Sequence, residues 1–216
     1  MGQLEPKALA TLENAESASA RYVVLDEFLA PEELETITNY TLEHEADFST
    51  SVVVSPEVEG GVLDYDHRRS RVLMEPECRE VVLERIKSVL PRMLEKLGME
   101  EFPISQVEAQ ITASNDGDFF HCHSDDGNER VATRQLTFVY FFHREPRQFE
   151  GGELRIYDRR GGEEQSAGVG SYHAIVPQQN QIVLFPCSLM HEITAVECPS
   201  QAFADSRFTL NGWLHR

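Results

Sequence analysis

The segment Phe119-Phe120-His121-Cys122-His123-Ser124-Asp125 carries the most informative pattern in the chain. It follows Asn115-Asp116-Gly117, a strong signal for a tight turn, and the half-apolar run 107–113. This order predicts a strand, a turn and a second strand that ends near the last of the quoted residues. Side chains two positions apart on a strand point to the same face, so His123 and Asp125 are expected to share one.

An imidazole and a carboxylate held in this way make up two of the three ligands of a facial non-haem iron site. The third ligand of such a site is a distant histidine, and the opposite face of the metal stays open for chemistry. His191 is the natural candidate, because it comes just after the buried strand-like run 181–185. The residues by themselves therefore predict an iron oxygenase.

Length, charge and cysteine content limit the class of protein. The 216 residues are enough for one good hydrophobic core but too few for two independent ones. The 37 acidic and 19 basic side chains give a formal net charge of −18, which disfavours nucleic acid and anionic membrane as partners. The four cysteines are widely spaced and form no Cys-x-x-Cys pair, as is typical of free thiols in a reducing compartment. No apolar run reaches membrane-spanning length, so we expect a cytoplasmic protein. The sequence does not determine its oligomeric state.

The order of the predicted elements indicates the architecture. Residues 1–20 are expected to be a loosely held lead-in to a single domain over 21–216. Helices are predicted over 31–45 and 80–97, and Pro91 predicts a kink in the second helix or two consecutive helices. Helices followed by many strands predict an α+β fold, a barrel-like double sheet with the helices on one outer face. The predicted strands are 21–25, 51–54, 70–74, 107–113, 119–125, 134–142, 152–157, 172–176, 181–185 and 207–214.

The last predicted strand has two contrasting faces. Apolar residues and one glycine alternate there with Arg207, Thr209, Asn211 and Trp213. A barrel interior that is polar usually holds a ligand. A dianionic ligand needs a cation at its far end, and a guanidinium can bind a carboxylate with two hydrogen bonds. Arg207 is placed for this role, with Thr209 on the same face.

Taken in order, these residues resemble the pattern of the 2-oxoglutarate- and iron(II)-dependent dioxygenases, in particular the prolyl 4-hydroxylase-like branch. The pattern is His123-x-Asp125, the distal His191 and then Arg207-x-Thr209. The similarity covers nearly the whole chain. Other segments that resemble the family are 22–34, 115–120, 136–142, 151–156 and 207–213.

The resemblance implies a double-stranded β-helix, or jelly-roll, core over about 105–216, with Fe(II) bound by His123, Asp125 and His191. It also implies that O2 cleaves 2-oxoglutarate to succinate and CO2 while an unactivated C–H bond of a substrate is hydroxylated. The expected primary substrate is a prolyl or another amino-acid or peptide group, and a small metabolite is the alternative. The resemblance also leaves room for ascorbate as an additional cofactor.

The same resemblance assigns residues to 2-oxoglutarate. The 1-carboxylate and 2-oxo group would chelate the iron, and the 5-carboxylate would bind Arg207. Thr209 and Tyr140 are expected to donate hydroxyl hydrogen bonds to that carboxylate, Tyr140 by its place in the strand after the His-x-Asp motif. The chain departs from the family at Ser114, where a tyrosine often lines the keto-acid pocket, and at 197–200, which form an inserted loop before Arg207.

The segment 55–71 has the composition of a lid. It contains Pro56, the pair Gly60-Gly61 and then a dense polar group. A reactive iron centre must be shielded until substrate is in place, and a segment that opens and closes usually does this. A plain surface hairpin is the alternative, in which case 126–133 would be the candidate. The residues expected to face the metal and contact the primary substrate are Tyr65, Asp66, Arg68, Arg69 and Trp213.

Two rival functions stay open on the sequence. A cupin-type metalloenzyme that does not use 2-oxoglutarate would employ His121 and His123 as a His-x-His motif. That class expects a glutamate shortly after the second histidine, where this chain has Gly127 and Asn128. A non-catalytic metal-binding or regulatory jelly-roll module would usually have a damaged ligand set, whereas here the set is intact. Iron-dependent conversion of 2-oxoglutarate to succinate distinguishes all three.

Overall fold

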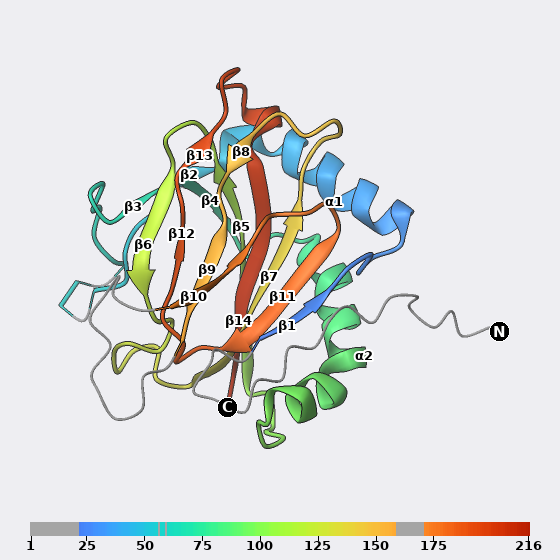
Figure 1. Ribbon diagram of the computed structural model, residues 1–216, viewed down its shortest axis with the longest axis vertical. Helices are drawn as coiled ribbons and strands as arrows, with labels where there is room; N and C mark the ends of the chain where they lie inside the picture. The colour runs from blue at the N-terminus through green and yellow to red at the C-terminus, as the bar shows by residue number, and fades with distance from the viewer. Residues whose placement is uncertain (1–21, 56, 59, 159–170) are drawn as a thin grey trace.

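The computed structural model describes residues 22–55, 57–58, 60–158 and 171–216. The lead-in expected at 1–20 lies outside the described residues. Two antiparallel sheets and two helices make up most of the rest (Figure 1). No helix of the described part is long and apolar enough to cross a membrane.

The larger sheet has seven strands, and every pair of neighbours is antiparallel. The strands are β1 (Val23–Leu25), β2 (Ser49–Thr50), β4 (Arg71–Met74), β5 (Gln106–Ser114), β7 (Arg134–Phe142), β11 (Gln181–Pro186) and β14 (Arg207–His215). Their order in the sheet is β1-β11-β7-β14-β5-β4-β2. The three long strands β5, β7 and β14 therefore lie next to one another at its centre.

The smaller sheet has five strands, also antiparallel. These are β3 (Arg68–Arg69), β6 (Phe119–His123), β9 (Leu154–Tyr157), β10 (Tyr172–Ile175) and β12 (His191–Ile193), in the order β10-β9-β12-β6-β3. A separate pair is formed by β8 (Glu150–Gly151) and β13 (Val196–Glu197). The two main sheets form the predicted double-stranded β-helix, so the expected α+β jelly-roll fold is confirmed.

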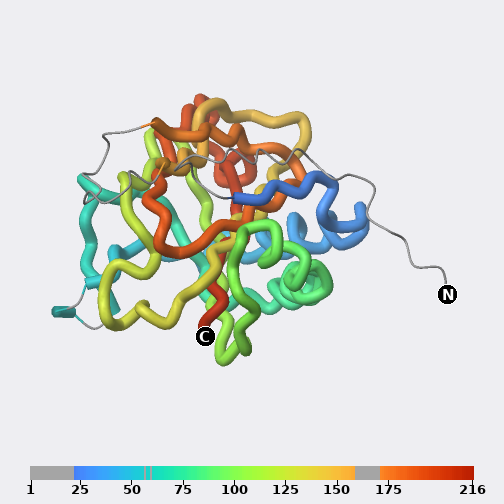
Figure 2. The backbone as a smooth tube through the Cα atoms, turned by 60° about the horizontal axis from the view of Figure 1, so that its bottom comes forward, coloured from blue at the N-terminus to red at the C-terminus, as the bar shows by residue number. Residues whose placement is uncertain are grey.

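Both helices pack on the outer face of the larger sheet, α1 (Pro31–Glu43) and α2 (Arg79–Leu97). Figure 2, turned from the first view, keeps them on the same side of the molecule. Their buried residues share one hydrophobic cluster with β5, β7 and β14. Short 3₁₀ turns follow α1 at Glu45–Asp47 and precede β14 at Phe203–Asp205.

The sequence explains where each helix begins and ends. Pro31 opens α1, where a missing backbone N–H costs nothing, and the Glu33 carboxylate accepts a hydrogen bond from the Ala30 N–H at 2.8 Å. Gly98 ends α2 in the left-handed conformation, with φ 63°. The second helix runs through Pro91 as one element, so the alternative of two consecutive helices is wrong. Its apolar stripe continues on one face past the proline, and burial of that stripe keeps the helix intact.

Strand alternation separates the helix side of the larger sheet from the interior of the barrel. Along β7, Phe138, Tyr140 and Phe142 belong to the cluster under the helices, while Val139 and Phe141 belong to a cluster inside the barrel. The same alternation on β14 turns its polar residues inward, because its apolar residues Phe208, Leu210 and Leu214 pack under the helices.

Two local predictions differ from the structure. The strand expected at 51–54 is replaced by β2, two residues earlier, and by an isolated bridge between Val53 and Val62. The chain turns there because the Ser51 N–H and hydroxyl both bond to Ser70. The second difference concerns Asp125, which lies in the turn after β6 and not on the strand, since β6 ends at His123.

Candidate metal and keto-acid site

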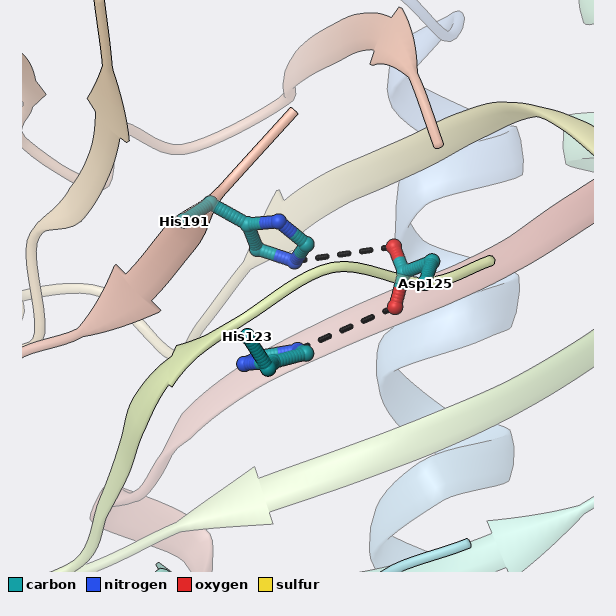
Figure 3. Close-up of side chains that lie close together, drawn as sticks. All are labelled: His123, Asp125 and His191. Atoms are coloured by element: carbon teal, nitrogen blue, oxygen red, sulfur yellow. Dashed lines mark ion pairs between the residues drawn. The ribbon is translucent and has the colours of Figure 1, made fainter. Parts of the chain in front are cut away.

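Three predicted ligands come together at one end of the smaller sheet (Figure 3). His123 ends β6 and His191 begins β12, and the two are direct partners in the antiparallel register. Asp125 follows in the turn, where its N–H donates to the Cys187 carbonyl at 2.9 Å. His123 Nε2 lies 3.7 Å from Asp125 Oδ1, and His191 Nε2 lies 3.5 Å from Asp125 Oδ2.

The hydrogen bonds of the two imidazoles determine which nitrogen can bind a metal. Nδ1 of His123 is 2.8 Å from the His121 carbonyl, and Nδ1 of His191 is 2.9 Å from the Leu189 carbonyl. A carbonyl only accepts, so each Nδ1 carries the proton and each Nε2 offers a lone pair. Burial, reinforced by nearby His191, lowers the pKa of His123 to about 3, so its imidazole is neutral at pH 7. The donor set therefore fits a first-row metal ion such as Fe(II).

A hydroxyl group on β7 holds the Asp125 carboxylate in place. The Thr137 hydroxyl donates to Asp125 Oδ2 at 2.6 Å and also lies 3.2 Å from Cys187 Sγ. Burial by itself would raise the pKa of Asp125, but the neighbouring His191 and His123 together with the Thr137 hydrogen bond bring it below its usual value. The carboxylate is therefore ionised and fixed in direction before any metal binds.

A cavity opens beside these ligands and is called the inner cavity here. The inward residues of β14 line it, and Arg207 lies among them with only 2 % of its surface exposed. Its Nε donates to the Gly152 carbonyl at 2.8 Å, and its Nη2 has no hydrogen-bond partner among the described residues. Burial without a counter-ion lowers the pKa of Arg207 to about 9. A buried guanidinium without a counter-ion is suited to bind the carboxylate of a ligand.

Gly152 permits this position of the guanidinium. A β-carbon added to Gly152 would lie 2.5 Å from Arg207 Cδ, and the residue has a positive φ of 64°. The expected loop at 197–200 does not displace Arg207, because β13 pairs with β8 next to Gly152 and closes that end of the barrel. Ser114, which replaces the tyrosine of the family, is the cross-strand neighbour of Arg207 and lines the same cavity.

Other hydroxyls and amides on the cavity wall form a connected set. Thr209 Oγ1 donates to Asn211 Oδ1 at 3.2 Å, and Thr112 Oγ1 donates to the same oxygen at 2.8 Å. Gln110 extends the set through its amide, which donates to Thr112. Thr209 is thus brought to the same wall as Arg207, as expected.

Tyr140 is not brought to the site, and its assignment to the keto acid is wrong. Its hydroxyl donates to Asn180 Oδ1 at 2.9 Å and its ring packs against Phe28, on the helix side of the larger sheet. The reason is strand parity. Thr137 and Val139 line the inner cavity, so the residue after Val139 must point the other way.

A second cavity, the outer cavity, also borders the ligands and shares His123, Asp125, Arg68 and Trp213 with the first. Its walls come from Val52–Val54 and from the turn after β6, including Gly127, Asn128 and Val131. The segments 55–71 and 126–133 thus both contribute residues around the metal ligands.

The predicted substrate residues fall into two groups. Arg68 and Arg69 on β3 pair with β6 and line the inner cavity, where the Arg68 guanidinium lies 4.7 Å from the centroid of the Phe120 ring. Tyr65, with 53 % of its surface exposed, and Asp66 are not among the lining residues. His121 is exposed and lies outside the ligand cluster, which leaves the cupin pattern without its first histidine.

Sequence reasoning missed Thr137, Cys187 and Gly152. Alternation along 134–142 could have identified Thr137, since it shares a face with Val139 and differs in parity from Tyr140. The pair Gly151-Gly152 was visible as a turn signal, but its contact with Arg207 depends on the folded barrel.

Comparisons with known proteins agree with this geometry. Residues 109–215 match the family model of the 2OG-Fe(II) oxygenase superfamily. An uncharacterized PKHD-type hydroxylase of Synechocystis sp. is 35% identical over 198 residues, which cover 90% of this chain. The chain spans 63% of the length of that relative.

Two solved structures have the same fold. A prolyl-4-hydroxylase of Pseudomonas putida has a TM-score of 0.65 at 16% identity, covering 92% of this chain and 95% of that one. A prolyl hydroxylase of Trichoplax adhaerens, in complex with a peptide fragment of the hypoxia inducible factor oxygen degradation domain, has a TM-score of 0.64 at 14% identity. That match covers 91% of this chain and 84% of the other.

Proposed function

We propose that this chain, which belongs through residues 109–215 to the 2OG-Fe(II) oxygenase superfamily, is an Fe(II)- and 2-oxoglutarate-dependent hydroxylase. The observation that carries the proposal is the buried Arg207, whose Nη2 lacks a partner and which lines the same cavity as His123, Asp125 and His191. Three metal-ligand side chains alone would suit many metalloproteins. A buried, unpaired guanidinium on the facing sheet adds the requirement for an anionic co-substrate.

His123, Asp125 and His191 would hold Fe(II), and Arg207 would hold the distal carboxylate of 2-oxoglutarate. When bound, these two groups supply the chemistry, in which O2 converts the keto acid to succinate and CO2 and one oxygen atom enters a substrate C–H bond. The chain itself binds, orients and shields. Thr137 keeps the Asp125 carboxylate in one direction.

Apolar side chains exclude water from the inner cavity between the metal ligands and Arg207. Val139, Leu154 and Ile193 line it, and the Trp213 indole lies at the junction with the outer cavity. The Trp213 ring is held 3.7 Å below the Arg134 guanidinium, which is itself paired with Glu108. A dry cavity strengthens the pairing of a carboxylate with Arg207 and limits loss of the oxidant to solvent.

The proposed primary substrate is a prolyl or another amino-acid or peptide group, and it would enter through the outer cavity past Arg68, Arg69 and Trp213. The peptide complex of the Trichoplax adhaerens structure supports a peptide in this fold. We assign the cytoplasm as the compartment, because Cys78, Cys187 and Cys198 are free thiols and the four cysteines are widely spaced in the sequence.

The hairpin that leads into β3 is proposed to close over the mouth when the primary substrate binds. Its last residues, Arg68 and Arg69, line the inner cavity, whereas Tyr65 and Asp66 would reach substrate only after such a movement. Hydrogen exchange of 60–69 should slow on substrate binding. Unchanged exchange would identify this segment as a plain surface hairpin.

Succinate release tests the proposed function. Protein loaded anaerobically with Fe(II) is exposed to O2 and 2-oxoglutarate, and succinate is measured by mass spectrometry with and without peptides and free amino acids. His123→Ala, which removes one ligand, is the matched control and should abolish succinate formation. If the wild-type protein binds metal but neither binds nor converts 2-oxoglutarate, the non-catalytic module is the better description.

A further inference from the structure

The two cavities are lined by cations in an otherwise acidic protein. Among the described residues, the only carboxylate lining either cavity is that of the metal ligand Asp125, although the whole chain has a formal net charge of −18. Arg207 is accounted for by the keto acid, and Arg134 by its ion pair with Glu108. The other lining guanidinium groups are those of Arg68 and Arg69.

Arg68 lies where the inner and outer cavities meet, next to the metal ligands. Its guanidinium covers the Phe120 ring, and that ring stacks on His123 with centroids 3.6 Å apart. Its Nε donates to Ser70 Oγ and its Nη1 to the Val52 carbonyl, each at 3.3 Å. No ion pair joins Arg68 to a carboxylate in the described part of the chain, and its remaining N–H donors are free for a ligand.

In a site loaded with Fe(II) and 2-oxoglutarate, the charge of Arg68 is not balanced by any opposite charge. The charges of Fe(II) and Arg207 equal those of Asp125 and the 2-oxoglutarate dianion, so the site is neutral without any contribution from Arg68. Arg68 is half-buried beside this neutral centre, and an anion that bound there would form a charge-assisted pair with its remaining N–H donors. No described residue supplies such an anion, so the primary substrate is the group that can bring it.

We propose that the primary substrate carries a carboxylate near the C–H bond to be hydroxylated, and that Arg68 binds this carboxylate. The inference rests on the proposed function and specifies the substrate class of the same site. The carboxylate can belong to a free amino acid, to the C-terminus of a peptide or to an acidic side chain. Arg69 on the same strand, held over Phe119, adds a second positive charge at the entrance.

Matched acid and amide substrates test the assignment. Free amino acids are compared with their amides, peptide acids with peptide amides, and peptides containing Asp or Glu with those containing Asn or Gln. Substrate-stimulated succinate release gives kcat/KM for each pair in the wild type, Arg68→Gln, Arg68→Lys and the control Arg92→Gln, an exposed charge on α2. In the wild type and Arg92→Gln one class of acid should exceed its amide by about 10- to 100-fold, the usual range for a hydrogen bond to a charged group. In Arg68→Gln that ratio should fall close to one, with partial recovery in Arg68→Lys.

Several outcomes would overturn the proposal. One is that the wild type converts the amide as well as the acid in every class of substrate that it turns over. Another is an acid-over-amide ratio that Arg68→Gln leaves intact, as expected if Arg68 only holds Val52 and Ser70. If no pair is turned over, the affinities of N-acetyl-L-proline and its amide for the Zn(II)–2-oxoglutarate form test the assignment. Trp213, the only tryptophan of the chain, gives the fluorescence signal. Equal affinities there reject the assignment. Failure of the proposed function would appear separately, as loss of 2-oxoglutarate binding before any substrate is added.

Discussion

Arg207→Ala removes the group that we expect to bind the distal carboxylate of 2-oxoglutarate. The side chain is 2 % exposed, and to the described residues it makes one hydrogen bond, from Nε to the Gly152 carbonyl, so most of its donors are available to a ligand. Alanine leaves a buried space without any donor. The keto acid would then have to lose its hydration without a partner for its second carboxylate.

Removing one partner of a buried charge pair is penalised by about 2 to 5 kcal/mol. This range corresponds to a rise of roughly 30- to 5,000-fold in the Kd or apparent KM for 2-oxoglutarate. Metal affinity should change far less, because Arg207 is not among the residues paired or bonded with His123, Asp125 or His191.

Anaerobic titration of the metal-loaded protein with 2-oxoglutarate measures the affinity, and uncoupled succinate release gives the KM. Arg207→Lys keeps the charge and should recover part of the loss, because lysine lacks the planar fork. Arg155→Gln is the matched control, since Arg155 on β9 is paired with Glu153 and Glu192 and lies outside the cavity lining. The reasoning fails if Arg207→Ala binds 2-oxoglutarate with wild-type affinity, and a loss in Arg155→Gln would move the role to Arg155.

Three further predictions concern the surroundings of the ligands. Thr137→Val should weaken metal binding by about 10- to 100-fold while Thr137→Ser keeps it, as isothermal titration would detect; equal affinities in both variants would deny the hydroxyl a role in orienting Asp125. The pKa of His123 is lowered to about 3, so the metal-free fold binds fewer protons than the unfolded chain and loses about 2 kcal/mol between pH 7 and pH 5. Denaturant unfolding of the apoprotein should record this loss and His123→Gln should reduce it, whereas a pH-independent stability would contradict a neutral buried imidazole. Gly152→Ala should displace Arg207 and raise the KM for 2-oxoglutarate without changing metal affinity, and a wild-type KM would show that the barrel accommodates the added methyl group.

Much of the site follows from the sequence because its signals are local. His123 and Asp125 are two residues apart, and the alternation along 207–214 separates polar from apolar positions without reference to other strands. His191 follows a run of buried residues, and the antiparallel pairing of β12 with β6 then places it beside His123. Length, periodicity and the order of the elements were enough to predict a barrel-like double sheet with the helices on one outer face, and the family resemblance implied the jelly-roll core.

What the sequence did not determine depends on parity and on long-range contact. Tyr140 and Val139 are adjacent, and a change of one position exchanges the two faces of a strand. Both side chains can pack on either face, so only the parity of Thr137 along 134–142 could have separated them. The Thr137 contact with Cys187 joins β7 to the turn after β11, which no local pattern encodes. The β6 strand ends before Asp125 because the Asp125 N–H is taken by the Cys187 carbonyl.

The two histidines proposed to bind the metal and the cation proposed to bind the keto acid belong to different sheets. His123 and His191 lie on β6 and β12 of the smaller sheet, whereas Arg207 lies on β14 of the larger one. A ligand that binds both the metal and Arg207 therefore connects the two sheets across the inner cavity. Its binding energy adds to the stability of the folded state, because the unfolded chain cannot hold the two ends together.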